Sequence, residues 1–456
     1  MSGKESMVMT EGKIVKPLLL FILPMIGSSI FQQLYNTADF LFVGNLLGKT
    51  SAAAVGASST LITCIIGLFS GISVGTSVAA AQAVGSKMPA RADAALHSSV
   101  LFGLVGGGVL TLAGILEAPG ILNLLNTPAS AIPEAVVYIR IYLLSLPMLI
   151  FYNMCAGALR ACGDSRTPFR ILVVCGFVNV AADLLFLRVI PLGVSGVAIA
   201  TTISQGLSAV LAAVSLRREG RPVRLAVKKL RMDGTVMKQI LYIGLPSGIQ
   251  SIIITFSNVM VQYYINGFGE TAVAAFATYY KVENFVYLPI MAFGQAITTF
   301  SGQNAGAGYF RRVRRGTVLT ALMGAGVTFC VAGLILLFPD TVFGWLIKDR
   351  DVVKDALKIA FVSFPFYWIY PIMEVAGGSL RGMGYSVSSM TIIILNLCVV
   401  RVSLLAVFSA RFRTLRSIAS VYPITWALAA VCFIVLFLVV IRKKCGEVRK
   451  PAEVIF

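Results

Sequence analysis

Long apolar runs separated by short polar segments follow one another along the whole chain. Each run has about 20 or more residues, enough to cross about 30 Å of hydrocarbon as an α-helix. The runs lack the period-two alternation that marks a membrane-spanning β-barrel. We therefore predict an all-α integral membrane protein with about twelve transmembrane helices. The expected spans lie near 15–44, 52–84, 93–116, 134–158, 168–188, 192–216, 237–266, 272–304, 313–338, 353–378, 387–409 and 417–441.

Composition narrows the class of protein further. Of the 456 residues, 57% are hydrophobic and only 12% are charged, and the mean hydropathy is +0.87. No soluble domain has this balance, and 42 glycines suit the close packing of helices in lipid. Residues 1–17 contain no apolar core followed by a small-residue cleavage site, so we expect no cleaved signal peptide.

Motifs of enzymes and of metal sites are absent from the sequence. It contains no Walker-type phosphate loop, nucleophile elbow or metalloprotease motif. The eight cysteines form no CxxC pair and His97 is the one histidine, so the sequence predicts neither a disulfide framework nor a zinc site. We expect His97 to be a surface or packing residue, and we expect a protein that is not an enzyme and needs no cofactor.

The net charge of +19 follows membrane topology and does not point to nucleic acid. With the N-terminus placed inside, 26 lysines and arginines fall on the inner side, 9 fall outside and 3 lie within spans, which accounts for all 38. Cytoplasmic loops carry this excess of basic residues. We predict both termini on the cytoplasmic side of the plasma membrane and no nucleic-acid partner.

A basic loop at 217–238 divides the chain into two halves that repeat one another. NLLGKTSAAAVGAS from Asn45 matches NGFGETAVAAFATY from Asn266, and GALR ending at Arg160 matches GSLR ending at Arg381, each at a shift of 221 residues. Parallel repeats of this kind build two bundles related by an axis along the membrane normal. We expect two six-helix bundles with pseudo-two-fold symmetry, at 1–216 and 237–441, a cytoplasmic linker at 217–236 and a tail at 442–456.

Polar side chains follow one stripe of the first span. Ser28, Gln32, Tyr35 and Asp39 recur at helical spacing, with Asn36 at the edge of the stripe. A carboxylate inside a bilayer costs several kcal/mol unless it is paired, hydrated or protonated, so its default interpretation is functional. We expect Asp39 to bind a cation, and Gln32, Tyr35 and Asn36 to contact a transported molecule.

Two residues below this stripe could let the helix bend. Pro24 removes one backbone hydrogen bond, and Gly27 follows one turn later. We expect both to act as a hinge.

A second acid is expected at the same depth as Asp39. Asp183 and Asn179 share one face of the fifth span, and Thr201 lies a few turns into the sixth. Two carboxylates in one poorly hydrated pocket raise each other's proton affinity. The set could therefore carry a proton, and the oxygens of Asp39 and Asp183 would also suit Na⁺.

The second half lacks an equivalent of Asp39 and carries other charges. Lys281 and Glu283 lie in the eighth span and Glu374 in the tenth, among tyrosines whose faces could bind an organic cation. These residues are candidates for substrate contacts, or for an ion pair that only fixes packing. We expect Arg140 and Arg401 near helix ends or paired internally.

Taken in order, the motifs resemble those of the multidrug and toxic compound extrusion (MATE) family. They are an opening proline with an aspartate before VGNLLG, GALRACGDSRTPF and GSLRGMGYS after the fourth and tenth spans, and NVAADLLF followed by GVSGVAIATTIS. The resemblance covers nearly the whole chain. In the branch that it resembles, the cation site maps onto Asp39, Asn179, Asp183 and Thr201. Another branch places its acid in the seventh span, where SGIQSIIITFSNVM has none.

The resemblance implies a monomeric exporter of lipophilic organic cations, embedded in the lipid bilayer and driven by exchange for H⁺ or Na⁺. Two alternatives stay open. A flippase of lipid-linked saccharides shares the superfamily, but its anionic cargo calls for a basic cavity, whereas the acids within spans outnumber the bases here. A channel or receptor is the other. The sequence does not name the substrate or choose between H⁺ and Na⁺.

Overall fold

The structure is a computed structural model that describes residues 9–124, 127–218 and 222–447. Every element in these ranges is a helix, as the apolar runs predict. Within the described residues, nine helices are long and apolar enough to cross a membrane, or up to eleven when each of two bent pairs counts as one span. The remaining expected span, 272–304, lies in α9 (Glu270–Gly306), which carries Lys281 and Glu283.

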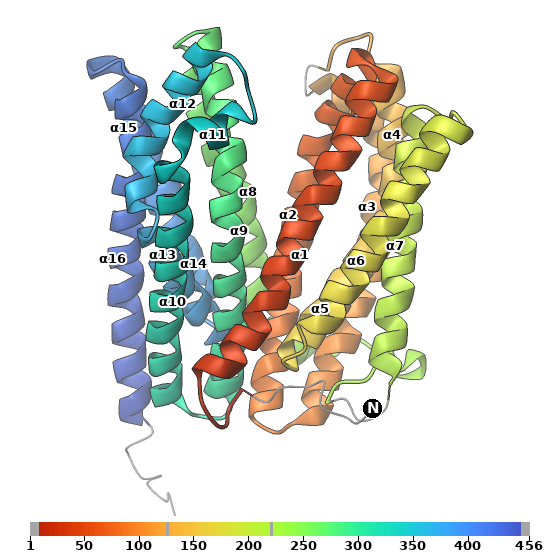
Figure 1. Cartoon of the computed structure of the whole chain (residues 1–456). Helices are drawn as coiled ribbons and strands as arrows, with labels where there is room; N and C mark the ends of the chain where they lie inside the picture. The colour runs from red at the N-terminus through yellow and green to blue at the C-terminus, as the bar shows by residue number, and fades with distance from the viewer. Residues whose placement is uncertain (1–8, 125–126, 219–221, 448–456) are drawn as a thin grey trace, which may run out of the picture. The chain divides into compact units, whose positions relative to one another are not determined.

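The described chain divides into two compact units. One comprises 23–248 and the other combines 9–22 with the chain after 248. The first unit contains most of α1 (Val15–Phe42) and the helices up to the start of α8 (Gly234–Asn266), which lie side by side in Figure 1. Its other elements are η1 (Val43–Leu47), α2 (Lys49–Gly85), α3 (Pro89–Leu124), α4 (Ile132–Leu144), α5 (Leu146–Ala161), α6 (Arg166–Leu184), η2 (Leu185–Val189), α7 (Val194–Arg217) and η3 (Val227–Lys229).

The second unit has a matching succession of helices after α8 and α9. They are α10 (Phe310–Leu337), α11 (Pro339–Gly344), α12 (Arg350–Ser363), η4 (Phe364–Phe366), α13 (Ile369–Gly382), α14 (Ser386–Ile393), η5 (Ile394–Val400), α15 (Arg401–Arg411) and α16 (Leu415–Glu447). The expected tail at 442–456 is therefore helical up to Glu447, and the rest of it lies outside the described residues.

The duplicated sequence produces duplicated backbone geometry. Gly48 and Gly269, which precede α2 and α9, have φ of 90° and 93°, a region that only glycine adopts without strain. The same shift relates close helix contacts. A Cβ at Gly157 would lie 2.9 Å from the carbonyl oxygen of Ser73, and one at Gly378 would lie 2.6 Å from that of Gly294. Glycine therefore allows α5 to approach α2, and α13 to approach α9, equally closely.

The two helices that pass between units do so beside prolines. The division falls between Ile22 and Leu23 in α1 and between Gly248 and Ile249 in α8. Pro24 and Pro246 lie within two or three residues of these points. Within the described residues, both crossings from one unit to the other thus fall inside a helix, away from the expected linker at 217–236.

That linker is fastened to α3. Asp93 accepts the backbone N–H of Arg224, and the buried His97 accepts that of Ala226 at 3.0 Å. His97 also bonds the Asp93 carbonyl at 2.7 Å, which leaves its Nε2 free to accept. His97 is therefore a buried packing residue and not a surface residue, the two alternatives that the sequence left open.

Candidate functional site

The two acids of the first unit lie together. Asp39 is in the last turn of α1 and Asp183 is next to the end of α6. Their carboxyl groups lie within hydrogen-bonding reach of each other. Asp183 is fully buried, whereas Asp39 is partly accessible. The sequence thus predicts the pairing of two groups that are 144 positions apart.

Asn179 joins these acids one turn before Asp183. In the amide orientation that satisfies both groups, its nitrogen donates to the two Asp39 carboxylate oxygens at 3.2 and 3.1 Å. Neither carboxyl oxygen of Asp183 receives a hydrogen bond from a described residue. A carboxylate without donors in a buried site is costly. A proton held between Asp39 and Asp183, or a cation bound by both, would satisfy it.

Aromatic residues of α4 surround this pair, and sequence reasoning did not identify them. Tyr138 and Tyr142 lie close enough to Asp39 to interact with its charge, and their rings lie 6.0 Å apart. Tyr138 is buried among apolar residues that include Val43 and Val197. Its ring adds to the low-polarity surroundings in which a shared proton is held tightly. The four-residue spacing of the tyrosines was the available signal.

Short π-helical turns follow both acids. η1 begins four residues after Asp39, and η2 begins two residues after Asp183. Such turns inside longer helices occur frequently at functional sites because they change the direction of the following side chains. No feature of the apolar pattern distinguishes these turns from ordinary helix.

The other residues expected near the acids have more open surroundings. Thr201 in α7 is half-buried and donates to the carbonyl of Val197 at 3.0 Å, which leaves its oxygen able to accept. Gln32 and Asn36 are exposed, and Tyr35 is half-buried. They therefore line an accessible face of α1.

The hinge candidates lie inside a continuous helix. α1 runs through Pro24 without a break, and Ser28 donates to the Pro24 carbonyl at 2.9 Å. Gly27 faces Phe169 of α6, whose ring atoms would lie 3.1 Å from an added Cβ. Gly27 thus has a packing role, whatever it contributes to bending.

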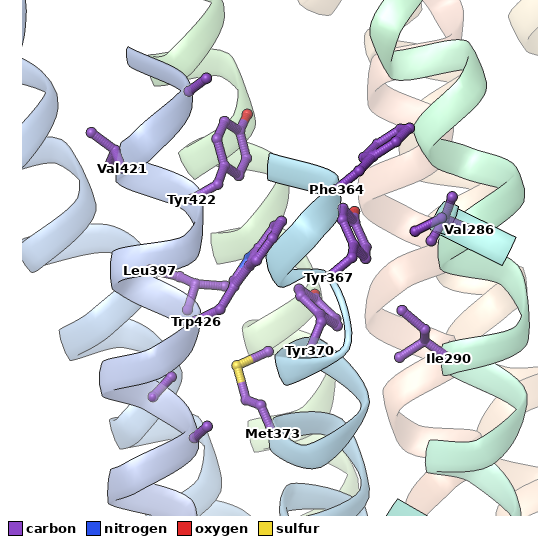
Figure 2. Close-up of a cluster of buried hydrophobic side chains, with 14 of the residues drawn as sticks. Val286, Ile290, Phe364, Tyr367, Tyr370, Met373, Leu397, Val421, Tyr422 and Trp426 are labelled. Carbon is purple, nitrogen blue, oxygen red and sulfur yellow. The ribbon is translucent and has the colours of Figure 1, made fainter. Parts of the chain in front are cut away.

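In the second unit, Glu283 of α9 is buried and held by tyrosines. The Tyr367 hydroxyl donates to its carboxylate at 2.5 Å, and the Tyr279 hydroxyl lies 3.4 Å from the same oxygen. Tyr367 belongs to an aromatic cluster with Tyr370, Trp426 and Phe364, and Figure 2 shows Trp426 on α16 and the other three rings on the segment that runs from η4 into α13. The two hydroxyl contacts hold one carboxylate oxygen of Glu283 toward this cluster.

A cavity lies beside Glu283. Its volume is about 100 Å³. All its lining residues belong to the second unit. Half of the lining residues are aromatic, and four others carry amide or charged side chains: Asn258, Glu283, Asn284 and Arg401. Arg401 lies in the middle of the span Ser386–Arg411 and not near its ends, and its guanidinium donates internally to the Thr425 hydroxyl.

The remaining candidates of this unit lie elsewhere. Glu374 forms an ion pair with Arg381 two turns along α13, and both side chains are buried. Lys281 is exposed and makes no ion pair with any described residue. The structure therefore brings Glu283, and not Lys281 or Glu374, to the cavity.

The chain matches one protein-family model twice, once in each of its repeated halves. A family model described as MatE matches residues 24–185 and, again, residues 246–407. The two matches are offset by 222 positions and together cover more than half of the chain.

Curated relatives extend over most of the sequence. The probable multidrug resistance protein YpnP of Bacillus subtilis is 28% identical over 404 residues, which cover 88% of this chain and 90% of that protein. The probable multidrug resistance protein YoeA of the same organism is 27% identical over 376 residues, 80% of each chain.

Solved structures share the fold. One described as the outward-facing conformation of a multidrug resistance MATE family transporter of the MOP superfamily has a TM-score of 0.92. Its sequence is 22% identical to this one, and the match covers 98% of this chain and 100% of that chain.

Proposed function

The chain belongs to the MATE family of membrane transporters, and on that premise we propose that it exports lipophilic organic cations in exchange for H⁺ or Na⁺. The relatives named as multidrug resistance proteins support a broad range of small-molecule substrates. The observation that carries the exchange is the pair Asp39 and Asp183, with Asn179 on one acid and no described donor on the other.

Coupling would follow from competition for this pair. One proton shared by the two carboxyl groups supplies the hydrogen bond that Asp183 lacks. A cation that approaches the pair is attracted more strongly once the proton has left, because the protonated pair carries less negative charge. Proton binding would therefore displace the cargo, and loss of the proton would restore affinity for it.

Na⁺ could use the same oxygens. The described residues contain no group of three or more His, Cys, Asp or Glu side chains. Na⁺ would accordingly be held by the Asp39 and Asp183 carboxylates with neutral oxygens such as that of Thr201, whose hydroxyl can accept. Either ion would be transported cargo and not a resident cofactor.

Movement would be concentrated in the helices that join the units. Pro24 lies just after the point at which α1 passes into the first unit, and a proline cannot complete the helical hydrogen bonds there. We propose that α1 bends at Pro24 and Gly27 when the charge at Asp39 changes, which would couple ion binding to alternating access. The protein would work as a monomer in the plasma membrane, with both termini in the cytoplasm.

The test is transport into everted membrane vesicles that contain the protein. Uptake of a fluorescent organic cation such as ethidium is measured with a pH gradient alone, a Na⁺ gradient alone, or neither. The proposal predicts uptake that depends on one gradient and is lost in Asp39→Asn and Asp183→Asn vesicles with equal protein content. Uptake by wild type that is independent of both gradients would contradict it.

A further inference from the structure

Arg401 is a buried charge without a matching carboxylate. Its side chain is 3% exposed, within a membrane span. The guanidinium reaches the Thr425 hydroxyl only at 3.3 and 3.4 Å, and it lies 4.9 Å from the ring of Tyr422. No carboxylate of the described chain lies within ion-pair distance of it. An ionised residue in this position is expensive and is functional by default.

Arg401 and Glu283 line the same cavity from different helices. Glu283 comes from α9, and Arg401 stands at the junction of the π-helical η5 and α15. The Glu283 carboxylate is close enough to interact with the guanidinium charge, but it bonds to tyrosine hydroxyls instead. The cavity therefore presents one negative and one positive group that do not neutralise each other by direct contact.

The neutral lining suits an aromatic molecule. Tyr280, Tyr287, Tyr370 and Trp426 supply ring surfaces, and Asn284 adds a polar side chain to the wall. The free space is enough for a carboxylate group and too small for a whole drug-sized molecule, so the rest of such a molecule would extend from it. A purely cationic ligand would meet repulsion from Arg401 here.

We propose that this cavity is a subsite for the carboxylate of zwitterionic aromatic substrates, with Arg401 binding the carboxylate and Glu283 facing the positive part. The planar guanidinium matches a carboxylate in two parallel hydrogen bonds. This inference rests on the proposed export of small organic molecules. It extends their class from cations, which the acids of the first unit favour, to molecules that carry both charges.

Two dyes that differ in one group provide the test. Rhodamine 123 is a cationic methyl ester, and rhodamine 110 has the free carboxylate in its place. Fluorescence polarisation measures the binding of each dye to the purified protein in lipid nanodiscs. Wild type should bind both dyes. Arg401→Gln should weaken binding of rhodamine 110 by about tenfold or more and leave rhodamine 123 unchanged or tighter, because a charged hydrogen-bonding partner is lost for one dye only.

Matched variants separate charge from shape. Arg401→Lys should retain part of the affinity for rhodamine 110, and the exposed Arg140→Gln should leave both dyes as in wild type. Equal weakening of both dyes by Arg401→Gln, or no weakening of either, would overturn the subsite.

The wild-type comparison is informative even if Arg401→Gln does not fold. Binding of rhodamine 123 without rhodamine 110 would overturn the subsite and leave cation export standing. Failure to bind either dye would count against both proposals.

Discussion

Single buried charges differ in what they can do, because their partners differ. Asp183 has a second acid as its neighbour and no described donor, Glu283 has two tyrosines, and Glu374 has Arg381. Only the first arrangement gains a hydrogen bond when a proton or cation arrives. Partner identity, more than burial, is therefore the reason why we propose Asp183 for ion binding and expect Glu374 to serve packing.

The ion pair of Glu374 and Arg381 should stabilise the second unit without taking part in transport. Arg381→Met leaves a buried carboxylate without its partner and should cost about 3 kcal/mol of unfolding free energy. Glu374→Gln combined with Arg381→Met should recover most of that loss, as measured by denaturant unfolding in detergent. If Glu374 contacts substrate instead, the folded double variant will bind ethidium more weakly than wild type.

Sequence reasoning identified acids more readily than their surroundings. Asp39, Asp183 and Glu283 stand out because a carboxylate in an apolar run has no ordinary explanation. Tyr138 and Tyr142 gave no such signal, since tyrosine is common in membrane helices. Arg401 was visible inside the expected span 387–409, but its lack of a carboxylate partner depends on how η5 and α16 pack, which periodicity does not predict.

At the scale of single helices, proline and glycine decide how elements bend and approach. Pro24→Ala restores a backbone hydrogen bond and should straighten α1. If α1 must bend during the cycle, efflux should slow about fivefold or more with little change in ethidium affinity. Pro119→Ala, inside α3, is the matched control. Efflux at the wild-type rate, or loss of binding together with efflux, would show that Pro24 is not a hinge.

Glycines at helix contacts should be intolerant of larger residues. Gly378→Val places side-chain atoms against the backbone of α9 and should cost about 3 kcal/mol or prevent folding. Gly326→Val, in α10, has no atom within 4 Å of the added Cβ and should change stability by less than about 0.5 kcal/mol. Equal unfolding midpoints for the two variants would mean that α13 can move away from α9.

At the scale of the molecule, the repeat was readable because matched segments kept their spacing. The division of α1 and α8 between units could not be predicted from the sequence, since each helix is one uninterrupted apolar run.

The repeat also places equivalent side chains against the starts of these two helices. In the first unit Arg91 and Gln82 bind Gln239 in α8. In the second, Arg312 and Gln303, each 221 positions later, bind the backbone before α1.

Arg312 should therefore hold residues 9–12 in place, ahead of α1. It donates to the carbonyls of Met9, Glu11 and Gly12, and Met9 is fully buried. Arg312→Ala should raise hydrogen exchange of the Met9 amide about tenfold, because local opening becomes easier. The nearby exposed Arg315→Ala is the control. Unchanged exchange in Arg312→Ala would show that Gln303 and Asn304 hold this segment without it.

The central claim is that organic cation and coupling ion compete for Asp39 and Asp183. Its most direct test is proton release when ethidium binds to the purified protein in weakly buffered solution, repeated with added Na⁺. We predict about one proton released per ethidium bound, or, if Na⁺ is the coupling ion, no release and displacement of ethidium by Na⁺. Asp39→Asn and Asp183→Asn should abolish the response, while Glu117→Gln, an exposed acid on α3, should preserve it. Ethidium binding that neither releases protons nor responds to Na⁺, or a wild-type response in both aspartate variants, would contradict the account.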